Sequence, residues 1–337
     1  MKFLVFSDLH SHQHREYGTI LESGIHSRLN DCLNVIIEIA DYAHANSVPL
    51  VLFGGDVFHT RKWVDTTVLN HTYRAFEYLA SKARVVMIAG NHDQYSKDNS
   101  VVSIELFRKI PNLTIASDEV VEIKEGNDTL QISCIPFHEN IQDTWIKIQE
   151  LANPRGVLLS HAELLAASTT KGYQFDMGLE PLSIAKLYDL AFIGHIHKFQ
   201  KLAHNVYIPG SPLAHNWGDA NDDKGFLLVD SNTKIVQRIV SGAPKFRQVS
   251  DVSELNNKDF FRLTSDRKIS STEIQEIKGT TKNLVIFEEA DIQKKNRSEI
   301  DVTMGYGDMI EKYILARNPG LDVEKLKKLG IECISES

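Results

Sequence analysis

The sequence predicts an α/β fold with two packed sheets, and three observations lead to this prediction. Short apolar runs of the length of buried strands recur along the chain. An amphipathic helix pattern separates the first two runs, as in right-handed strand–helix–strand units. After about residue 110 the runs follow one another closely, which favours a second, more antiparallel sheet packed on the first.

Five of the apolar runs end directly at a polar motif. These runs cover residues 3–6, 50–53, 85–89, 157–159 and 190–193. Because open α/β sheets bind their ligands at the carboxyl ends of the strands, we expect the five motifs to meet at one edge of a sheet.

The segments between and after these runs supply the other elements. Residues 27–46 carry apolar side chains at spacings of three and four, which predicts an amphipathic helix. Residues 65–82 and 100–109 are weaker helical candidates. Further strand-like runs, assigned to the second sheet, cover residues 113–115, 120–123, 130–135, 206–208, 226–229 and 235–239.

A change of pattern near residues 241–244 divides the chain. Residues 1–245 form the predicted main domain, and residues 246–292 form a small α+β unit with two strand-like runs around a helix-like one. A polar linker over 293–298 then leads to a helical tail over 299–337. The predicted organisation is therefore a large domain, a small one and a tail.

The composition is that of an ordinary globular protein, with 42% hydrophobic and 24% charged residues. The net charge of −8 does not indicate a stand-alone duplex binder, so any binding of DNA requires local cations, metal ions or a partner. Three widely spaced cysteines argue against a disulfide framework and favour a reducing, cytoplasmic location. Neither a signal peptide nor a membrane span is expected.

The motifs contain residue types that bind metal ions. Asp8 and His10 lie two positions apart, so in an extended segment their side chains share one side, and His195 and His197 repeat this spacing. Asp56 follows two glycines, which allow the backbone to turn tightly while a carboxylate bridges two ions. Taken singly, an aspartate at the end of a strand is more often a turn residue.

The tetrapeptide of residues 90–93 is more specific. Asn91 offers a neutral carbonyl oxygen as a ligand, whereas the neighbouring His92 is free to face the substrate. An imidazole that lies beside cations without binding them is a proton donor to the leaving oxygen, and Asp93 is the candidate to orient it. An incidental turn is the alternative for this tetrapeptide in isolation.

Together with His161, the motifs supply eight suitable residues, each placed after a strand. This ordered set predicts a two-metal phosphoesterase site. Mixed histidine, aspartate and asparagine ligands favour a transition metal such as Mn²⁺ over Mg²⁺. Two ions about 3.5 to 4 Å apart clamp a phosphate and lower the pKa of a bridging water.

The order of the motifs resembles the calcineurin-type metallophosphoesterase superfamily, and within it the SbcD-like nuclease subunits of double-strand-break repair, including phage-encoded members. The segments 178–181 and 208–212 fit that branch better than they fit small phosphomonoesterases. The resemblance implies a four-layer α/β/β/α sandwich with a small α+β capping domain and a C-terminal helical segment.

The resemblance also implies roles for the site residues. One metal ion is held by Asp8, His10, Asp56 and His197, and the other by Asp56, Asn91, His161 and His195. His92 is the general acid and not a ligand. The implied reaction is the attack of a metal-activated water on DNA phosphodiesters, with two divalent ions, most readily Mn²⁺. The activities are 3′ to 5′ exonuclease on duplex ends and endonuclease on single strands and hairpins.

The implied partner is an SbcC-like, SMC-type ATPase that binds the C-terminal helices, with a homodimer of the nuclease inside a heterotetramer. Two departures from the family pattern occur. His59 stands where the family commonly has an aspartate, and His12 and His14 replace a glycine-bearing turn. We expect His12 and His14 to be surface residues and not additional ligands.

Two other functions remain open from the sequence alone. A small-molecule phosphodiesterase of the same superfamily uses the same metal site, and the acidic composition favours it, whereas the residues after Pro244 argue against it. A non-catalytic interaction module is the other possibility. It is disfavoured because all eight positions are filled.

Overall fold

The computed structural model describes residues 1–14, 17–96, 100–265, 269–281, 284–288, 309, 311–314 and 322–327. The chain forms two compact units. The first comprises Met1–Arg247 and Lys258–Phe260, and the second comprises Gln248–Asn257 and Phe261–Ser337. Most of the tail expected over 299–337 lies outside the described residues.

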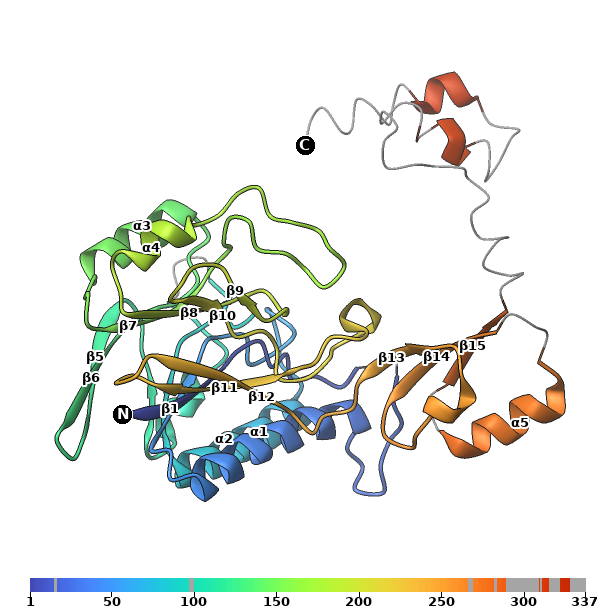
Figure 1. Ribbon diagram of the computed structural model, residues 1–337, viewed down its shortest axis with the longest axis horizontal. Helices are drawn as coiled ribbons and strands as arrows, with labels where there is room; N and C mark the ends of the chain where they lie inside the picture. Colours follow the sequence, from blue (N-terminus) through green and yellow to red (C-terminus); the bar gives the residue numbers. More distant parts are fainter. Residues whose placement is uncertain are drawn as a thin grey trace. The chain divides into compact units, whose positions relative to one another are not determined.

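The first unit contains a six-stranded sheet in the order β12-β11-β1-β2-β3-β4. Figure 1 labels its strands β1, β11 and β12. Its strands are β1 (Lys2–Phe6), β2 (Leu50–Phe53), β3 (Arg84–Met87), β4 (Leu113–Ile115), β11 (Gly225–Asp230) and β12 (Ile235–Val240). Strands β1 to β4 are parallel, whereas β11 is antiparallel to both β1 and β12. Helix α1 (Ser27–Ala45) connects β1 to β2, and α2 (Thr66–Lys82) connects β2 to β3, as the strand–helix–strand pattern predicted.

A second six-stranded sheet has the order β5-β6-β7-β8-β10-β9. Its strands are β5 (Glu119–Glu125), β6 (Asp128–Ile135), β7 (Val157–His161), β8 (Leu190–Gly194), β9 (Gln200–Lys201) and β10 (Val206–Ile208). The inner pairs β6–β7, β7–β8 and β8–β10 are parallel. Helices α3 (Ile141–Glu150) and α4 (Pro181–Ala185) pack against this sheet.

The division of strands between the sheets differs from the one expected. Strands β4, β11 and β12 belong to the first sheet, while β7 and β8, which carry two of the motifs, belong to the second. The burial of both faces of β11 explains why this strand belongs to the first sheet. Phe226 packs into the core on the helix side, and Leu227 packs into the core between the sheets. A strand that is apolar on both faces is stable only inside a covered sheet.

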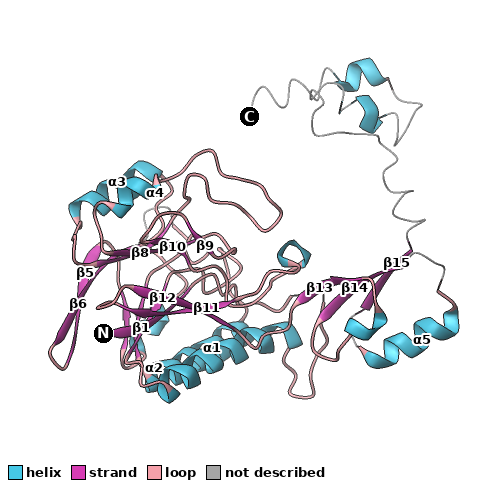
Figure 2. Cartoon of the chain, in the orientation of Figure 1, coloured by secondary structure: helices cyan, strands magenta, loops and turns pink. Residues whose placement is uncertain are grey.

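Three apolar cores separate four layers of secondary structure (Figure 2). The first lies between α1, α2 and the first sheet and contains Leu29 and Phe53. The second lies between the two sheets, where Phe3 meets Phe192 edge to face with ring centroids 6.0 Å apart. The third includes Ile148 of α3. The expected α/β/β/α sandwich is therefore confirmed.

The remaining elements are shorter. The helix expected over 100–109 is only a 3₁₀ turn, η1 (Glu105–Lys109), and two further 3₁₀ turns are η2 (Trp217–Asp219) and η3 (Val252–Glu254). A three-stranded sheet has the order β13-β14-β15, with β13 (Phe246–Val249), β14 (Phe260–Ser265) and β15 (Leu284–Glu288). Helix α5 (Ser271–Thr280) connects the parallel strands β14 and β15. It begins with a capping box, in which Ser270 and Glu273 satisfy each other's backbone N–H groups.

Among the described residues, no helix combines the length and the apolar character that crossing a membrane requires.

Candidate metal centre

The five motifs follow strands of both sheets and come together at one end of the sandwich. Asp8, Asp56 and Asn91 follow β1, β2 and β3 of the first sheet, and His161 and His195 stand at the ends of β7 and β8 of the second. The carboxyl ends of parallel strands thus form the site, as expected for α/β sheets. We expected the five motifs to meet at the edge of one sheet, but strands of both sheets contribute residues to the site.

One group of side chains surrounds His10. Its Nε2 lies 3.0 Å from Nε2 of His197 and 3.5 Å from Oδ2 of Asp56. Asp8 joins this group, with one ligand atom each of Asp8, His10 and Asp56 within 4.8 Å of the other two. Asp8, His10 and Asp56 are buried. Backbone N–H of His195 donates to the Asp8 carboxylate at 3.1 Å.

A second group surrounds His161. Nε2 of His161 lies 3.0 Å from Oδ1 of Asn91 and 3.5 Å from Oδ2 of Asp56. Oδ1 of Asn91 also lies 3.0 Å from Nδ1 of His195. The same carboxylate oxygen of Asp56 therefore belongs to both groups, so Asp56 would be the shared ligand if each group held an ion.

The donor atoms fit metal ions. The Asn91 amide turns its oxygen toward two imidazole nitrogens, although the opposite orientation would let its nitrogen donate to both. A cation between these atoms would satisfy the facing lone pairs, and an amide turned the other way would satisfy the two rings by donating to them. With metal–nitrogen bonds of about 2.0 to 2.1 Å, ligand atoms around one ion lie roughly 3 Å apart, as here.

A hydrogen bond to the backbone fixes the ring of His161. Its Nδ1–H donates to the carbonyl oxygen of Gly54 at 2.7 Å. With one proton on Nδ1, loss of the second proton would leave a lone pair on Nε2 that faces Asp56 and Asn91. Such an outer hydrogen bond sets both the tautomer and the direction of a ligating histidine.

Burial and charge shift the ionisation of the cluster. Burial alone would raise the pKa of Asp56, but the charges of His161 and His10 hold this pKa well below its usual range. Burial lowers the pKa of His161, but the negative Asp56 more than offsets it, and the pKa rises to about 9. Burial raises the pKa of Asp8. A bound cation would take the place of the positive charge that the protonated His161 ring gives the site.

Four of the site residues have an unusual backbone. The φ angles of Asp8, His10, Asp56 and His195 are 58°, 49°, 63° and 103°. Positive φ in residues other than glycine costs about 1 to 3 kcal/mol each and is found where the surroundings enforce it. Here the N–H of Asp8 donates to Gly55 O at 2.9 Å and that of His10 donates to Asp56 O at 3.0 Å. The side chains of Asp8 and His10 therefore meet through turns and not through an extended segment.

Glycine is required where the loops touch. A Cβ on Gly90 would collide with the carboxylate and the backbone nitrogen of Asp56. Gly55 has a φ of 99°, and a Cβ there would lie 2.6 Å from the Gly90 nitrogen. The loops after β2 and β3 approach this closely only because both positions lack a side chain.

His92 lies at the edge of the site and is half-buried. Its backbone N–H donates to Oδ1 of Asp56 at 2.8 Å, and its Nδ1–H donates to the carbonyl oxygen of His59 at 2.6 Å. The His92 ring meets that of His10 edge to face, with centroids 4.7 Å apart. The partner that orients His92 is therefore the backbone of His59.

Asp93, expected to orient His92, has other partners. Its carboxylate accepts backbone N–H groups of Asp56 at 2.8 Å, Val57 at 2.9 Å and Gly90 at 3.0 Å. It is fully buried, and burial together with the charge of Asp56 raises its pKa to about 7. Adjacent side chains point in different directions, and that of Asp93 joins the loops after β2 and β3. Its carboxylate therefore contacts the backbone around Asp56 and not the His92 ring.

The sequence reasoning missed several residues of the site. His215 is buried, and its ring packs against those of His10 and His197. Lys224 is only 4% exposed and donates from Nζ to the His197 carbonyl oxygen at 2.8 Å and to Oδ1 of Asp219 at 3.0 Å. The strand-like pattern around residues 226–229 gave no signal for a buried lysine just before it.

The extra histidines of the first motif lie apart from both groups. His12 and His14 are half-buried, and their rings pack against His59 with centroids 5.3 and 5.4 Å away. Burial lowers the pKa of His14 to about 3. They are more enclosed than the surface residues that the sequence suggested.

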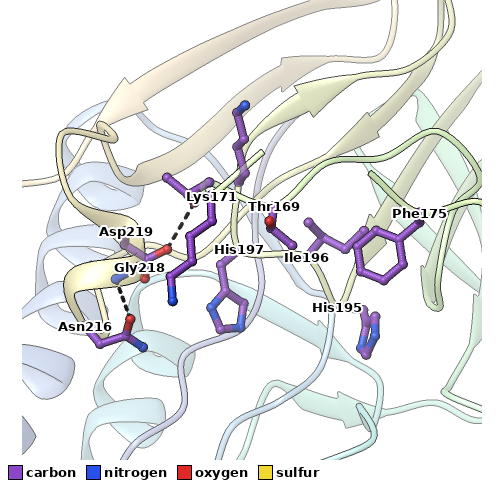
Figure 3. A pocket seen from close by; sticks show the side chains of 11 residues that line it. Thr169, Lys171, Phe175, His195, Ile196, His197, Asn216, Gly218 and Asp219 are labelled. Atoms are coloured by element: carbon purple, nitrogen blue, oxygen red, sulfur yellow. Dashed lines mark hydrogen bonds between the residues drawn. The ribbon is translucent and has the colours of Figure 1, made fainter. Parts of the chain in front are cut away.

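A cavity of about 240 Å³ adjoins the site. It is lined by Thr169, Thr170, Lys171, Phe175, His195, Ile196, His197, Lys198, Asn216, Gly218 and Asp219. Figure 3 shows Lys171 and Asn216 toward His197, and Phe175 toward His195. Lys171 and Phe175 come from the long loop between β7 and α4, which reaches over this end of the first unit (Figure 1).

Comparisons with known proteins agree with the chemistry of this site. A model of the calcineurin-like phosphoesterase family matches residues 1–199. The putative phosphoesterase 244L of Invertebrate iridescent virus 6 is 24% identical over 264 residues, which are 72% of this chain and 88% of the relative. Exonuclease subunit 1 of Enterobacteria phage T4 is 26% identical over 260 residues, 75% of this chain and 72% of the relative. The uncharacterized protein R555 of Acanthamoeba polyphaga mimivirus is 24% identical over 203 residues, which are 56% of this chain and 15% of that protein.

The buried Asp93 carboxylate gives a first prediction. Asp93→Asn places an amide N–H₂ against backbone donors, so we expect the free energy of unfolding to fall by about 2 to 4 kcal/mol. Because Asp56 loses its support, affinity for Mn²⁺ should fall about tenfold or more. Urea unfolding and calorimetric titration measure the two effects. Asp176→Asn, at an exposed carboxylate, is the matched control. Unchanged stability and Mn²⁺ affinity in Asp93→Asn would contradict the assigned role.

Proposed function

Given that this chain belongs to the calcineurin-like phosphoesterase family, we propose that its metal centre hydrolyses the phosphodiester bonds of DNA. The chain is a hydrolytic, metal-dependent enzyme of that family, and DNA is the substrate that the surroundings of the site favour. The resemblance to a phage exonuclease subunit supports the same substrate. We propose both 3′ to 5′ exonuclease action on duplex ends and endonuclease action on single strands and hairpins.

The main support for this proposal is the cavity beside His195 and His197. Two cations, Lys171 and Lys198, and one aromatic ring, Phe175, line it. Lysines contact the phosphates that flank a scissile bond, and aromatic rings stack on bases. A cavity that combines both beside a phosphoesterase centre suits a polynucleotide chain, although the net charge of the protein is −8.

The proposed ligand sets follow the two groups of side chains. One ion would be held by Asp8, His10, Asp56 and His197, and the other by Asp56, Asn91, His161 and His195. Mixed nitrogen and oxygen donors favour Mn²⁺ over Mg²⁺. When bound, such ions act as Lewis acids on the phosphoryl oxygens and make water nucleophilic at neutral pH.

The chain itself supplies the proton for the leaving group. The His59 carbonyl oxygen holds the Nδ1 proton of His92, which fixes the ring and leaves Nε2 to exchange protons with the substrate. The backbone N–H of His92 is tied to Asp56. The proposed general acid is therefore fixed in position relative to the bridging carboxylate.

We also propose that residues 299–337 bind an SbcC-like, SMC-type ATPase, with a nuclease homodimer in a heterotetramer. The phage relative is named as a subunit, which supports a partner for that protein. Helices that carry an apolar stripe dock into grooves of partner proteins. Cleavage in the cell would then depend on the ATPase as well as on the metal centre.

The alternative is a phosphodiesterase for small molecules, which the acidic composition favours. A comparison of DNA with a small phosphodiester as substrates distinguishes a nuclease from a small-molecule phosphodiesterase. We expect the full chain with Mn²⁺ to cleave linear duplex and single-stranded DNA as well as bis(p-nitrophenyl) phosphate, and EDTA to stop all three reactions. Lys171→Ala should raise KM for oligonucleotides severalfold, because one phosphate contact is lost, without changing kcat/KM for the small ester.

Lys201→Ala is the control for this comparison, since Lys201 lies outside the cavity with its ammonium over the Tyr207 ring. Cleavage of the small ester without any cleavage of DNA, even when an ATPase partner is added, would exclude the nuclease function.

His92→Ala tests the proposed general acid. We expect kcat for DNA to fall by about 10² to 10⁴ while Mn²⁺ stoichiometry and DNA affinity stay unchanged, since the ring is assigned to proton transfer and not to metal binding. Steady-state kinetics, metal analysis and fluorescence anisotropy measure these quantities. His44→Ala, at the exposed end of α1, is the control. Loss of bound metal in His92→Ala would refute the role.

The tail is tested by truncation. A chain that ends at residue 298 should keep its cleavage of bis(p-nitrophenyl) phosphate, because the residues of the metal centre all precede residue 225. It should no longer co-purify with the ATPase partner. Retained co-purification would count against the tail as the binding segment.

A further inference from the structure

Three imidazoles meet at the ion position next to His10, and one of them was not expected. The ring centroids of His10, His197 and His215 lie 4.9 Å (His10 to His197), 5.1 Å (His10 to His215) and 4.9 Å (His197 to His215) apart. One ring nitrogen of each lies within 4.8 Å of the other two. Rings bound to a single ion by bonds of about 2.0 to 2.1 Å have centroids roughly 4.5 to 5 Å apart. The triangle therefore has the size of a three-imidazole site.

His215 carries a lone pair that has no partner in the described part of the chain. Its Nε2 lies 3.0 Å from the carbonyl oxygen of Asp8, which only accepts hydrogen bonds, so the proton is on Nε2. Nδ1 is buried and lacks a hydrogen-bond partner. Buried polar atoms without partners are rare in proteins. A cation at this position would satisfy the atom.

The loop that carries His215 is held rigidly against His197. Oδ2 of Asp219 accepts the backbone N–H of His215 at 3.0 Å, and Oδ1 of Asp219 accepts Nζ of Lys224 at 3.0 Å. Lys224 Nζ also donates to the His197 carbonyl oxygen at 2.8 Å. The same buried ion pair thus positions two of the three imidazoles, as support around a metal site does.

We infer that His215 is a ligand of the ion that His10 and His197 would hold. This inference rests on the metal centre of the proposed function but not on DNA as its substrate. A third imidazole makes this position rich in nitrogen. Nitrogen donors favour Zn²⁺, Co²⁺ or Fe²⁺ over Mn²⁺, so the two ion positions differ in the metal they prefer.

The test uses His215→Gln in the full chain, because a glutamine amide can still donate to the Asp8 carbonyl oxygen while the ring nitrogen is lost. We expect affinity for Zn²⁺ to fall about 10- to 100-fold at one of two sites, measured by competition with a chromogenic chelator. Affinity for Mn²⁺ should fall less. The visible absorption of Co²⁺ bound at that site should also change. His44→Gln, on the exposed end of α1, is the matched control and should change neither quantity.

Unchanged Zn²⁺ affinity together with an unchanged Co²⁺ spectrum in folded His215→Gln would overturn the inference. If the variant does not fold, the wild-type chain decides the matter through anomalous diffraction from Zn²⁺-loaded crystals. A His215 ring nitrogen about 2.0 to 2.3 Å from the ion supports the inference, and a separation beyond about 3 Å overturns it. Absence of DNA cleavage would leave these metal readouts unaffected, so the two proposals fail separately.

Discussion

The carboxylate of Asp56 is the constraint around which the catalytic end of the protein is arranged. It is 1% exposed, and a buried negative charge is costly unless positive groups and donors surround it. His10 approaches it from the first sheet and His161 from the second, each at 3.5 Å. The backbone N–H of His92 completes its environment at 2.8 Å. Side chains from both sheets therefore surround the Asp56 carboxylate.

Sequence patterns predicted most of the elements but not their assignment to sheets. The apolar runs located β1, β2, β3, β7 and β8, and the spacing of three and four located α1. The assignment failed because neighbours in the sequence need not be neighbours in a sheet. Strand β11 is separated from β1 by more than half of the chain, yet the two strands pair. Both faces of β11 are apolar, and both are buried because β11 is an inner strand of the covered sheet. Periodicity describes one strand at a time and contains no information on its partner.

The site residues likewise include some that sequence patterns predicted and others that they did not. Residues named from motifs, such as Asp8 and Asn91, lie in the two groups of side chains because each ends a strand whose pattern is visible. Asp93 was named for the wrong contact, since its direction depends on the turn that it stabilises. His215 and Lys224 were missed because they come from a loop that reaches the site through tertiary packing. Candidate ligands at strand ends can be recognised from the neighbouring sequence, whereas the residues that hold these ligands in position come from distant parts of the chain.

The pairing of β1 with β11 also bears on how the protein is made. The antiparallel neighbour of residues 2–6, residues 225–230, is synthesised more than two hundred residues after them. Until then one edge of β1 is unpaired, and an unpaired apolar edge invites association with other chains. The segment that matches the phosphoesterase family, 1–199, ends before this neighbour. A nascent chain therefore exposes one edge of β1 until residues 225–230 have been translated.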